Sequence, residues 1–209
     1  MRPVFALAAL TCAVLAACTG VSTSSTNRAA TSPSSPSPAS SSHITGPLGS
    51  PGNPLVVSCD AESWPGPPSP PAPVTPGPRD LAVGPMYFPG GRTLGAYTPA
   101  QYGYAPVGRH SRFYKLALVV QPGATVTVTI GASVRDHVVI AAPGVGQLGP
   151  GGVTSATYHA CRHAGGFFAQ GFAFTGPPFR GCVPLEVTVD GQARVLHITL
   201  SLFAGSCAD

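Results

Sequence analysis

The sequence has few charged residues. Only 9% of its 209 residues are Asp, Glu, Lys or Arg, whereas roughly a quarter are charged in an average soluble domain. The 11 basic and 7 acidic residues give a formal net charge of +4 at pH 7 and form no dense basic stripe. Because nucleic-acid-binding domains present such a stripe, the composition argues against nucleic acid as a partner.

Motifs that are typical of hydrolases are also missing. The chain contains no Gly-x-Ser-x-Gly nucleophile elbow and no His-Glu-x-x-His zinc motif. Only one carboxylate, Glu186, falls clearly on an expected strand, so no pair is expected to face across a cleft as a glycosidase requires. We predict a non-enzymatic protein without a cofactor. The alternative is an extracellular hydrolase whose site the sequence does not reveal, since a Ser-His-Asp triad depends on geometry and not on spacing.

Helical periodicity is absent after the first 17 residues, because no stretch there shows apolar residues at 3.6-residue spacing. Apolar and polar residues instead alternate over short segments, which is typical of half-buried strands. The expected strands are residues 55–59, 81–88, 114–120, 126–130, 137–142, 153–161, 167–174, 183–189 and 196–202. Eight or nine strands and no helix predict an all-β, immunoglobulin-like β-sandwich, with a jelly roll as the alternative.

The clearest element is a β-hairpin over residues 182–202. Asp190-Gly191 suits the positive φ angles of a type I′ turn, and a two-residue loop would pair Leu185 with Leu196. In that register the apolar side chains of both strands lie on one face. The hairpin is therefore expected to have a core side and a solvent side.

Two other connections leave alternatives open. Gly84-Pro85 interrupts the segment 81–88, as at an edge strand or a bulge. Pro122-Gly123 suits a type II turn, which splays strands, so the chain either forms a hairpin there or crosses from one sheet to another.

The chain begins with Met1-Arg2 and an apolar run of about a dozen residues, too short to span a bilayer of roughly 30 Å and typical of a signal peptide. The run ends at Ala17-Cys18, which resembles the end of bacterial lipoprotein signals. The resemblance implies that residues 1–17 are removed and that Cys18 is lipidated. It places the protein at the outer face of the cytoplasmic membrane, and the alternative is secretion after an ordinary signal.

Composition divides the rest of the chain. Residues 18–54 are rich in Ser, Thr and Pro without apolar periodicity, which predicts a disordered tether. Residues 55–209 are expected to form the β-sandwich domain. Within this domain, residues 64–78 are so rich in Pro that we expect a surface loop.

Four cysteines remain in the expected domain, an even number that predicts two disulfides in an exported chain. Three pairings are open. We favour Cys161 with Cys182, which would link two neighbouring strands across the short segment between them. We also favour Cys59 with Cys207, which would link the first strand to the last.

Two weaker site hypotheses concern surface residues. His159 and His163 flank Cys161 at alternate positions, so a continuing strand would place three ligand types on one face of an exported copper- or zinc-binding protein. An oxidised Cys161 would oppose this. Arg109, Arg112 and Lys115 form the densest basic run and would contact anionic headgroups or wall polymers; otherwise the run is a solvated loop.

Several segments between residues 59 and 207 are similar to segments of a known protein family. They are residues 81–89, 114–124, 157–161, 171–172, 182–185 and 203–207. They resemble a family of exported, lipid-anchored β-domain proteins of high-GC actinobacteria. That family has no assigned activity, so the resemblance implies an extracellular β-domain with paired cysteines. We therefore predict a lipid-anchored cell-envelope protein with a non-catalytic binding or structural domain, whose partner is a cell-wall polymer or another envelope protein.

Overall fold

The structure, a computed structural model, describes residues 45–61, 75–99, 105–107, 111–142, 152–163, 165–175 and 179–207. The side chains of residues 105–107 and 111–113 lie outside this description. So do the expected signal peptide, Cys18 and most of the expected tether and Pro-rich loop. None of the helical segments in the described ranges has the length and apolar character needed to span a membrane.

The fold is mostly β, as the sequence predicts. Over the described ranges the chain forms thirteen short strands and three single-turn 3-10 helices, without an α-helix. The strands are β1 (Leu55–Val57), β2 (Leu81–Val83), β3 (Met86–Phe88), β4 (Ala105–Val107), β5 (Ser111–Lys115), β6 (Leu118–Val120), β7 (Thr125–Ile130), β8 (Val138–Ala141), β9 (Ser155–His159), β10 (Gly166–Phe168), β11 (Gly171–Phe174), β12 (Gly181–Val189) and β13 (Leu196–Leu202). The helical turns are η1 (Cys59–Ala61), η2 (Leu94–Ala96) and η3 (Ala132–Val134).

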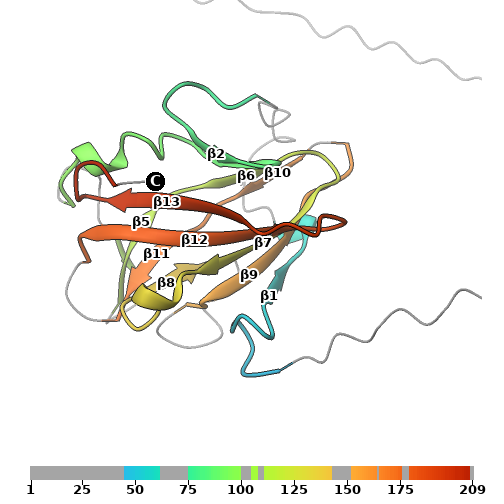
Figure 1. The fold of residues 1–209 in the computed structure, drawn as a ribbon, viewed down its shortest axis with the longest axis horizontal. Coiled ribbons are helices and arrows are strands. Elements are labelled where there is room, and N and C mark those ends of the chain that lie inside the picture. The colour runs from blue at the N-terminus through green and yellow to red at the C-terminus, as the bar shows by residue number, and fades with distance from the viewer. Residues whose placement is uncertain are drawn as a thin grey trace, which may run out of the picture. The chain divides into compact units, whose positions relative to one another are not determined.

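The strands form three sheets. A five-stranded sheet has the order β1-β9-β7-β12-β13, and two four-stranded sheets have the orders β10-β6-β3-β2 and β4-β5-β11-β8. Figure 1 shows the five-stranded sheet in front, with β5 and β11 behind it and β2, β6 and β10 along its upper side. The core lies between the five-stranded sheet and the other two.

One long antiparallel pairing, residues 114–120 against residues 166–174, runs through both four-stranded sheets. Gly166 pairs with Val120 in one sheet and Gly171 pairs with Lys115 in the other, in a single continuous register. The Leu116 amide, which lies between the two halves, donates to the Gln170 carbonyl at 2.9 Å. The segments 114–120 and 167–174, which we expected as single strands, are therefore each divided into two strands that keep one register and belong to different sheets.

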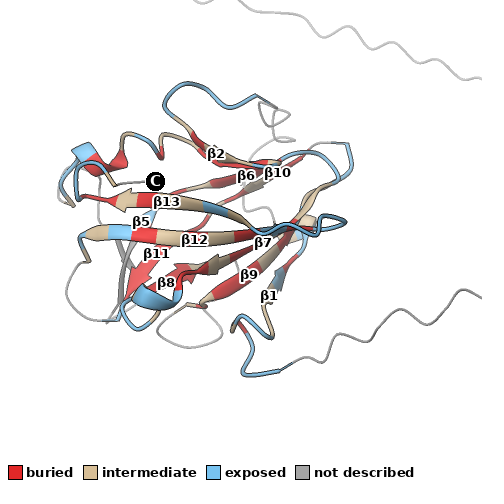
Figure 2. Ribbon diagram, viewed as in Figure 1, coloured by how far each residue is buried: buried red, intermediate tan, exposed pale blue. Residues whose placement is uncertain are grey.

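Alternation decides which face of β7 and β12 is buried, whereas β3, β6 and β11 are buried along their whole length (Figure 2). In β7, Val126, Val128 and Ile130 are 0 to 1% exposed, whereas the threonines between them are half-buried. This confirms the predicted inward face. The turn at Pro122-Gly123 leads from β6 into β7, which belongs to a different sheet, so this connection crosses between sheets.

The expected register of the hairpin over residues 182–202 is wrong by two residues. Leu185 pairs with Ile198, not with Leu196. The reason is a wider loop between the two strands. β12 continues to Val189, where it pairs with Val126 of β7. β13 begins only at Leu196. A shift of two residues keeps every side chain on its face, so the predicted core side is still the buried one.

Residues 81–88 form a hairpin and not one interrupted strand. Leu81 pairs with Phe88 and Val83 with Met86, so Gly84-Pro85 is the turn. Gly84 has a φ of 54°, a value that glycine adopts without strain.

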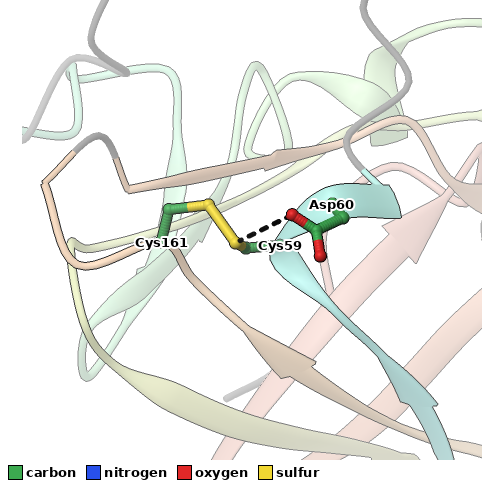
Figure 3. Close-up of a disulfide and its surroundings, with 3 residues drawn as sticks. All are labelled: Cys59, Asp60 and Cys161. Carbon is green, nitrogen blue, oxygen red and sulfur yellow. Dashed lines mark hydrogen bonds between the residues drawn. A yellow bond between two sulfur atoms is a disulfide. The ribbon is translucent and has the colours of Figure 1, made fainter.

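The favoured disulfide pairing is also wrong. The bridges are Cys59–Cys161 and Cys182–Cys207, with Cα–Cα distances of 5.2 and 5.7 Å (Figure 3 shows the first). The cause is the sheet topology. β1 runs parallel to β9, so Cys59 and Cys161, each just past the end of its strand, meet. The start of β12 lies opposite the end of β13, so the tail beyond β13 brings Cys207 back to Cys182.

The folded part of the chain begins earlier than residue 55. The carbonyl of Gly49 accepts hydrogen bonds from the amides of Thr154 and Ser155, both at 2.8 Å, at the start of β9. Within the segment, the Gly49 amide donates to the Asn53 carbonyl at 2.6 Å. Residues 45–54, which we assigned to the tether, therefore belong to the β-domain.

Candidate functional site

A groove of about 260 Å³ lies where the edges of two sheets meet. One wall is β2, the last strand of a four-stranded sheet, and the other is β13, the last strand of the five-stranded sheet. In Figure 1, β13 is the upper strand of the front sheet and β2 lies above it, and the two strands are in contact. The lining residues are Leu81, Ala82, Val83, Arg92, His197, Ile198 and Thr199.

Tight packing at one end keeps the two edges in place. The turn of the β2–β3 hairpin approaches the β12–β13 hairpin so closely that a Cβ on Gly84 would lie 2.9 Å from Leu196 Cδ1. Such a contact is shorter than packed carbon atoms adopt. The positive φ favours glycine at this turn, and a side chain there would also require the end of Leu196 to shift.

Arg92 is held at the groove by the loop that follows β3. Its Nε donates to the Asp80 carbonyl at 2.9 Å, and its backbone amide donates to the Arg79 carbonyl at 3.0 Å. The loop is in turn fixed by the Asp80 carboxylate, which accepts from the amides of Gly77 and Gly90 at 2.7 and 2.8 Å. These contacts restrain the exposed Arg92 through its backbone and through Nε of its side chain.

The Asp80 carboxylate also affects a neighbouring phenol. Burial raises the pKa of Tyr87 above its ordinary value of 10.0, and the negative charge of Asp80 raises this pKa further. Both oxygens of Asp80 already accept hydrogen bonds from backbone amides, so this carboxylate is a structural group of the loop.

His197 lies on the opposite wall, on the solvent side of β13. Its side chain is exposed, and its cross-strand neighbour on β12 is Glu186, which is half-buried. Thr199 adds a hydroxyl to the same wall. The groove thus combines a fixed positive charge, an imidazole and a hydroxyl with apolar strand residues, and no carboxylate or cysteine lines it.

This arrangement suits binding of an anion. Arg presents several N–H donors in a planar fork that matches a carboxylate or phosphate. The groove does not support hydrolysis by a pair of carboxylates, because no Asp or Glu lines it.

The expected basic contact surface is described only in part. Arg109 lies outside the described residues, and Arg112 is on β5 with its side chain outside the description. Lys115 ends β5 opposite Gly171 and is exposed. The structure therefore places one of the three side chains in solvent, and the joint surface stays a prediction.

The expected His-Cys-His metal site lacks its central ligand. Cys161 is bound to Cys59 in a disulfide and offers no thiolate, and a carboxylate oxygen of Asp60 lies 3.9 Å from Cys59 Sγ (Figure 3). His159 Nδ1 contacts Thr125 Oγ1 at 2.9 Å. Across the described ranges, no three side chains of His, Cys, Asp or Glu gather as a metal site would require.

Sequence reasoning missed Arg92 and His197. No local motif marks either residue, because 104 positions separate them along the chain and only the meeting of two sheet edges brings them to one groove. The available signal was indirect. Asp80 and the glycine-rich segment after β3 predict a turn, but they do not indicate what the turn holds in place.

Comparison of the chain with protein-family models, with curated proteins and with solved structures found no match.

Proposed function

We propose that this protein is a lipid-anchored cell-envelope protein whose β-domain is a non-catalytic binding module. The observation that carries the binding function is the groove between β2 and β13, with a guanidinium restrained through Nε and no carboxylate or cysteine in its lining. Preformed concave sites with a few convergent polar groups are the usual form of ligand sites. The anchor rests on the signal-like N-terminus and Cys18.

The compartment has independent support. The domain contains two disulfides, and disulfides persist in oxidising, extracytoplasmic environments. A lipid on Cys18 at the outer face of the cytoplasmic membrane agrees with this compartment. The segment between Cys18 and the domain would then act as a flexible stalk, as its Ser/Thr/Pro composition predicts.

The proposal includes an immunoglobulin-like sandwich, in the broad sense, as the architecture of the domain. What supports it is a five-stranded sheet whose apolar face packs on a second layer, with mostly antiparallel pairing. The proposal also keeps membership of the exported actinobacterial β-domain family, for which the segments quoted above are the support.

Lipidation is tested by fatty-acid labelling and fractionation. Cells given a radioactive fatty acid should label the protein, and a Cys18→Ser form should lose the label and leave the membrane, because a diacylated cysteine supplies the two chains that stable anchoring needs. Cys12→Ser is the matched control: this cysteine lies within the removed signal, so the label should remain. Membrane retention of the Cys18→Ser form would overturn the anchor.

A further inference from the structure

We propose that the groove between β2 and β13 binds the carboxylate end of an extended peptide, with Arg92 holding the carboxylate and a strand edge pairing with the peptide backbone. This inference rests on the proposed binding function and names the class of ligand.

Charge selects the carboxylate. Arg92 carries a permanent positive charge, and no acidic side chain lines the groove to neutralise it. The nearest acidic group along the loop, Asp80, has both carboxylate oxygens occupied by the amides of Gly77 and Gly90. Only Nε of Arg92 is used, in the bond to the Asp80 carbonyl, and the remaining N–H groups make no hydrogen bond to described residues. They are available to an incoming anion.

The walls select a peptide. Over the described ranges, β2 pairs only with β3, and β13 pairs only with β12. Each strand therefore presents a row of backbone N–H and C=O groups toward the groove side, and such an edge is a template for another extended chain. Addition of a strand to an exposed edge is a common mode of peptide recognition, and capture of a terminal carboxylate is another.

The size of the groove limits how much of the peptide enters. Sites for drug-sized ligands measure roughly 300 to 1,000 Å³, and this groove measures about 260 Å³. It therefore accommodates the terminal residues of a peptide. The apolar side chains of the lining, among them Val83 and Ile198, suit the small or apolar side chains of those residues.

The test uses nuclear magnetic resonance on the full mature chain, isotopically labelled and carrying Cys18→Ser so that it is free of lipid. The probes are N-acetyl-Ala-Ala with a free carboxylate, the same dipeptide as its C-terminal amide, and inorganic phosphate. We expect the acid to shift the amide signals of residues 81–83 and 197–199 with a millimolar Kd, and the amide to bind at least about tenfold more weakly.

Two variants and a control separate ligand contact from folding. Arg92→Gln removes the charge and His197→Gln removes the imidazole, and each should weaken binding of the acid. Arg180→Gln removes an equal charge from an exposed residue outside the groove and should leave binding unchanged. If Arg92→Gln disturbs the fold, the His197→Gln variant and the comparison of the acid with the amide still test whether the groove binds the carboxylate.

Three outcomes would overturn the inference. These are equal binding of acid and amide, shifts confined to other parts of the domain, and binding of phosphate without binding of the peptide acid. None of them bears on release of the Cys18→Ser form from membranes, so failure of this inference and failure of the anchor are distinguishable.

Discussion

Tyr158 and Gln170 form a polar link between the two layers of the domain. Tyr158 lies on β9 and Gln170 lies between β10 and β11, and their side chains are 0 and 1% exposed. The Tyr158 hydroxyl donates to Gln170 Oε1, and burial raises the pKa of Tyr158 well above its ordinary value. Because a buried amide oxygen without a donor is costly, the pair acts as a unit.

We expect Tyr158→Phe to lower the free energy of unfolding by about 1 to 3 kcal/mol, since it leaves the Gln170 amide buried without its donor. A Tyr158→Phe/Gln170→Leu double variant should recover part of this loss, because both polar partners are then absent. Urea unfolding measures each value. Thr125→Val is the control, since its partner His159 is exposed and the loss should stay within about 0.5 kcal/mol. A double variant less stable than the single one would contradict the pairing.

At the level of elements, the two candidate contact surfaces are the groove between β2 and β13 and the basic run before and within β5. The groove beside β13 is described in full, whereas the basic run before and within β5 is described only at Lys115. The two surfaces make separable predictions, because a basic run acts by charge and is screened by salt, while the groove requires a specific anion.

The basic run is tested by co-sedimentation with anionic vesicles and with isolated cell wall, using the lipid-free Cys18→Ser chain. Binding should fall as salt rises, and Arg109→Ala/Arg112→Ala/Lys115→Ala should sediment less at low salt, each charge contributing about 1 kcal/mol near an anionic surface. The matched control removes three exposed arginines elsewhere: Arg79→Ala/Arg180→Ala/Arg194→Ala. An equal loss in both variants would mean that net charge alone drives binding.

At the scale of the whole molecule, the two disulfides constrain the chain unequally. Cys59–Cys161 spans 102 residues and Cys182–Cys207 spans 25. In the chain-entropy model the first contributes about 4.7 kcal/mol and the second about 3.5 kcal/mol. The long bridge fastens the N-terminal strand β1 to β9, and the short one fastens the tail to β12.

Non-reducing peptide mapping should recover Cys59 with Cys161 and Cys182 with Cys207. Replacing both cysteines of the long bridge with serine should lower the free energy of unfolding by about 1 kcal/mol more than the same change in the short bridge, as urea unfolding of the two variants would show. A larger loss from the short bridge would mean that native packing of the tail outweighs chain entropy.

Local pattern in the sequence predicted the mostly β character of the fold and the buried faces of its clearest strands. The alternation in β7 and in the β12–β13 hairpin requires one buried face, and a two-residue change in loop length preserved that face because side chains alternate with period two. The even number of cysteines likewise predicted two disulfides. These features follow from local pattern and composition, which need no knowledge of neighbours.

Apart from the β12–β13 hairpin, which strands pair with one another could not be read from the sequence. The partners of Cys59 and Cys182 depend on the parallel pairing of β1 with β9 and on the return of the tail past β13, and neither leaves a local signal. The same holds for the candidate site. Arg92 and His197 share a groove because the edges of two sheets lie side by side, and long-range sheet order arises from packing of the whole core.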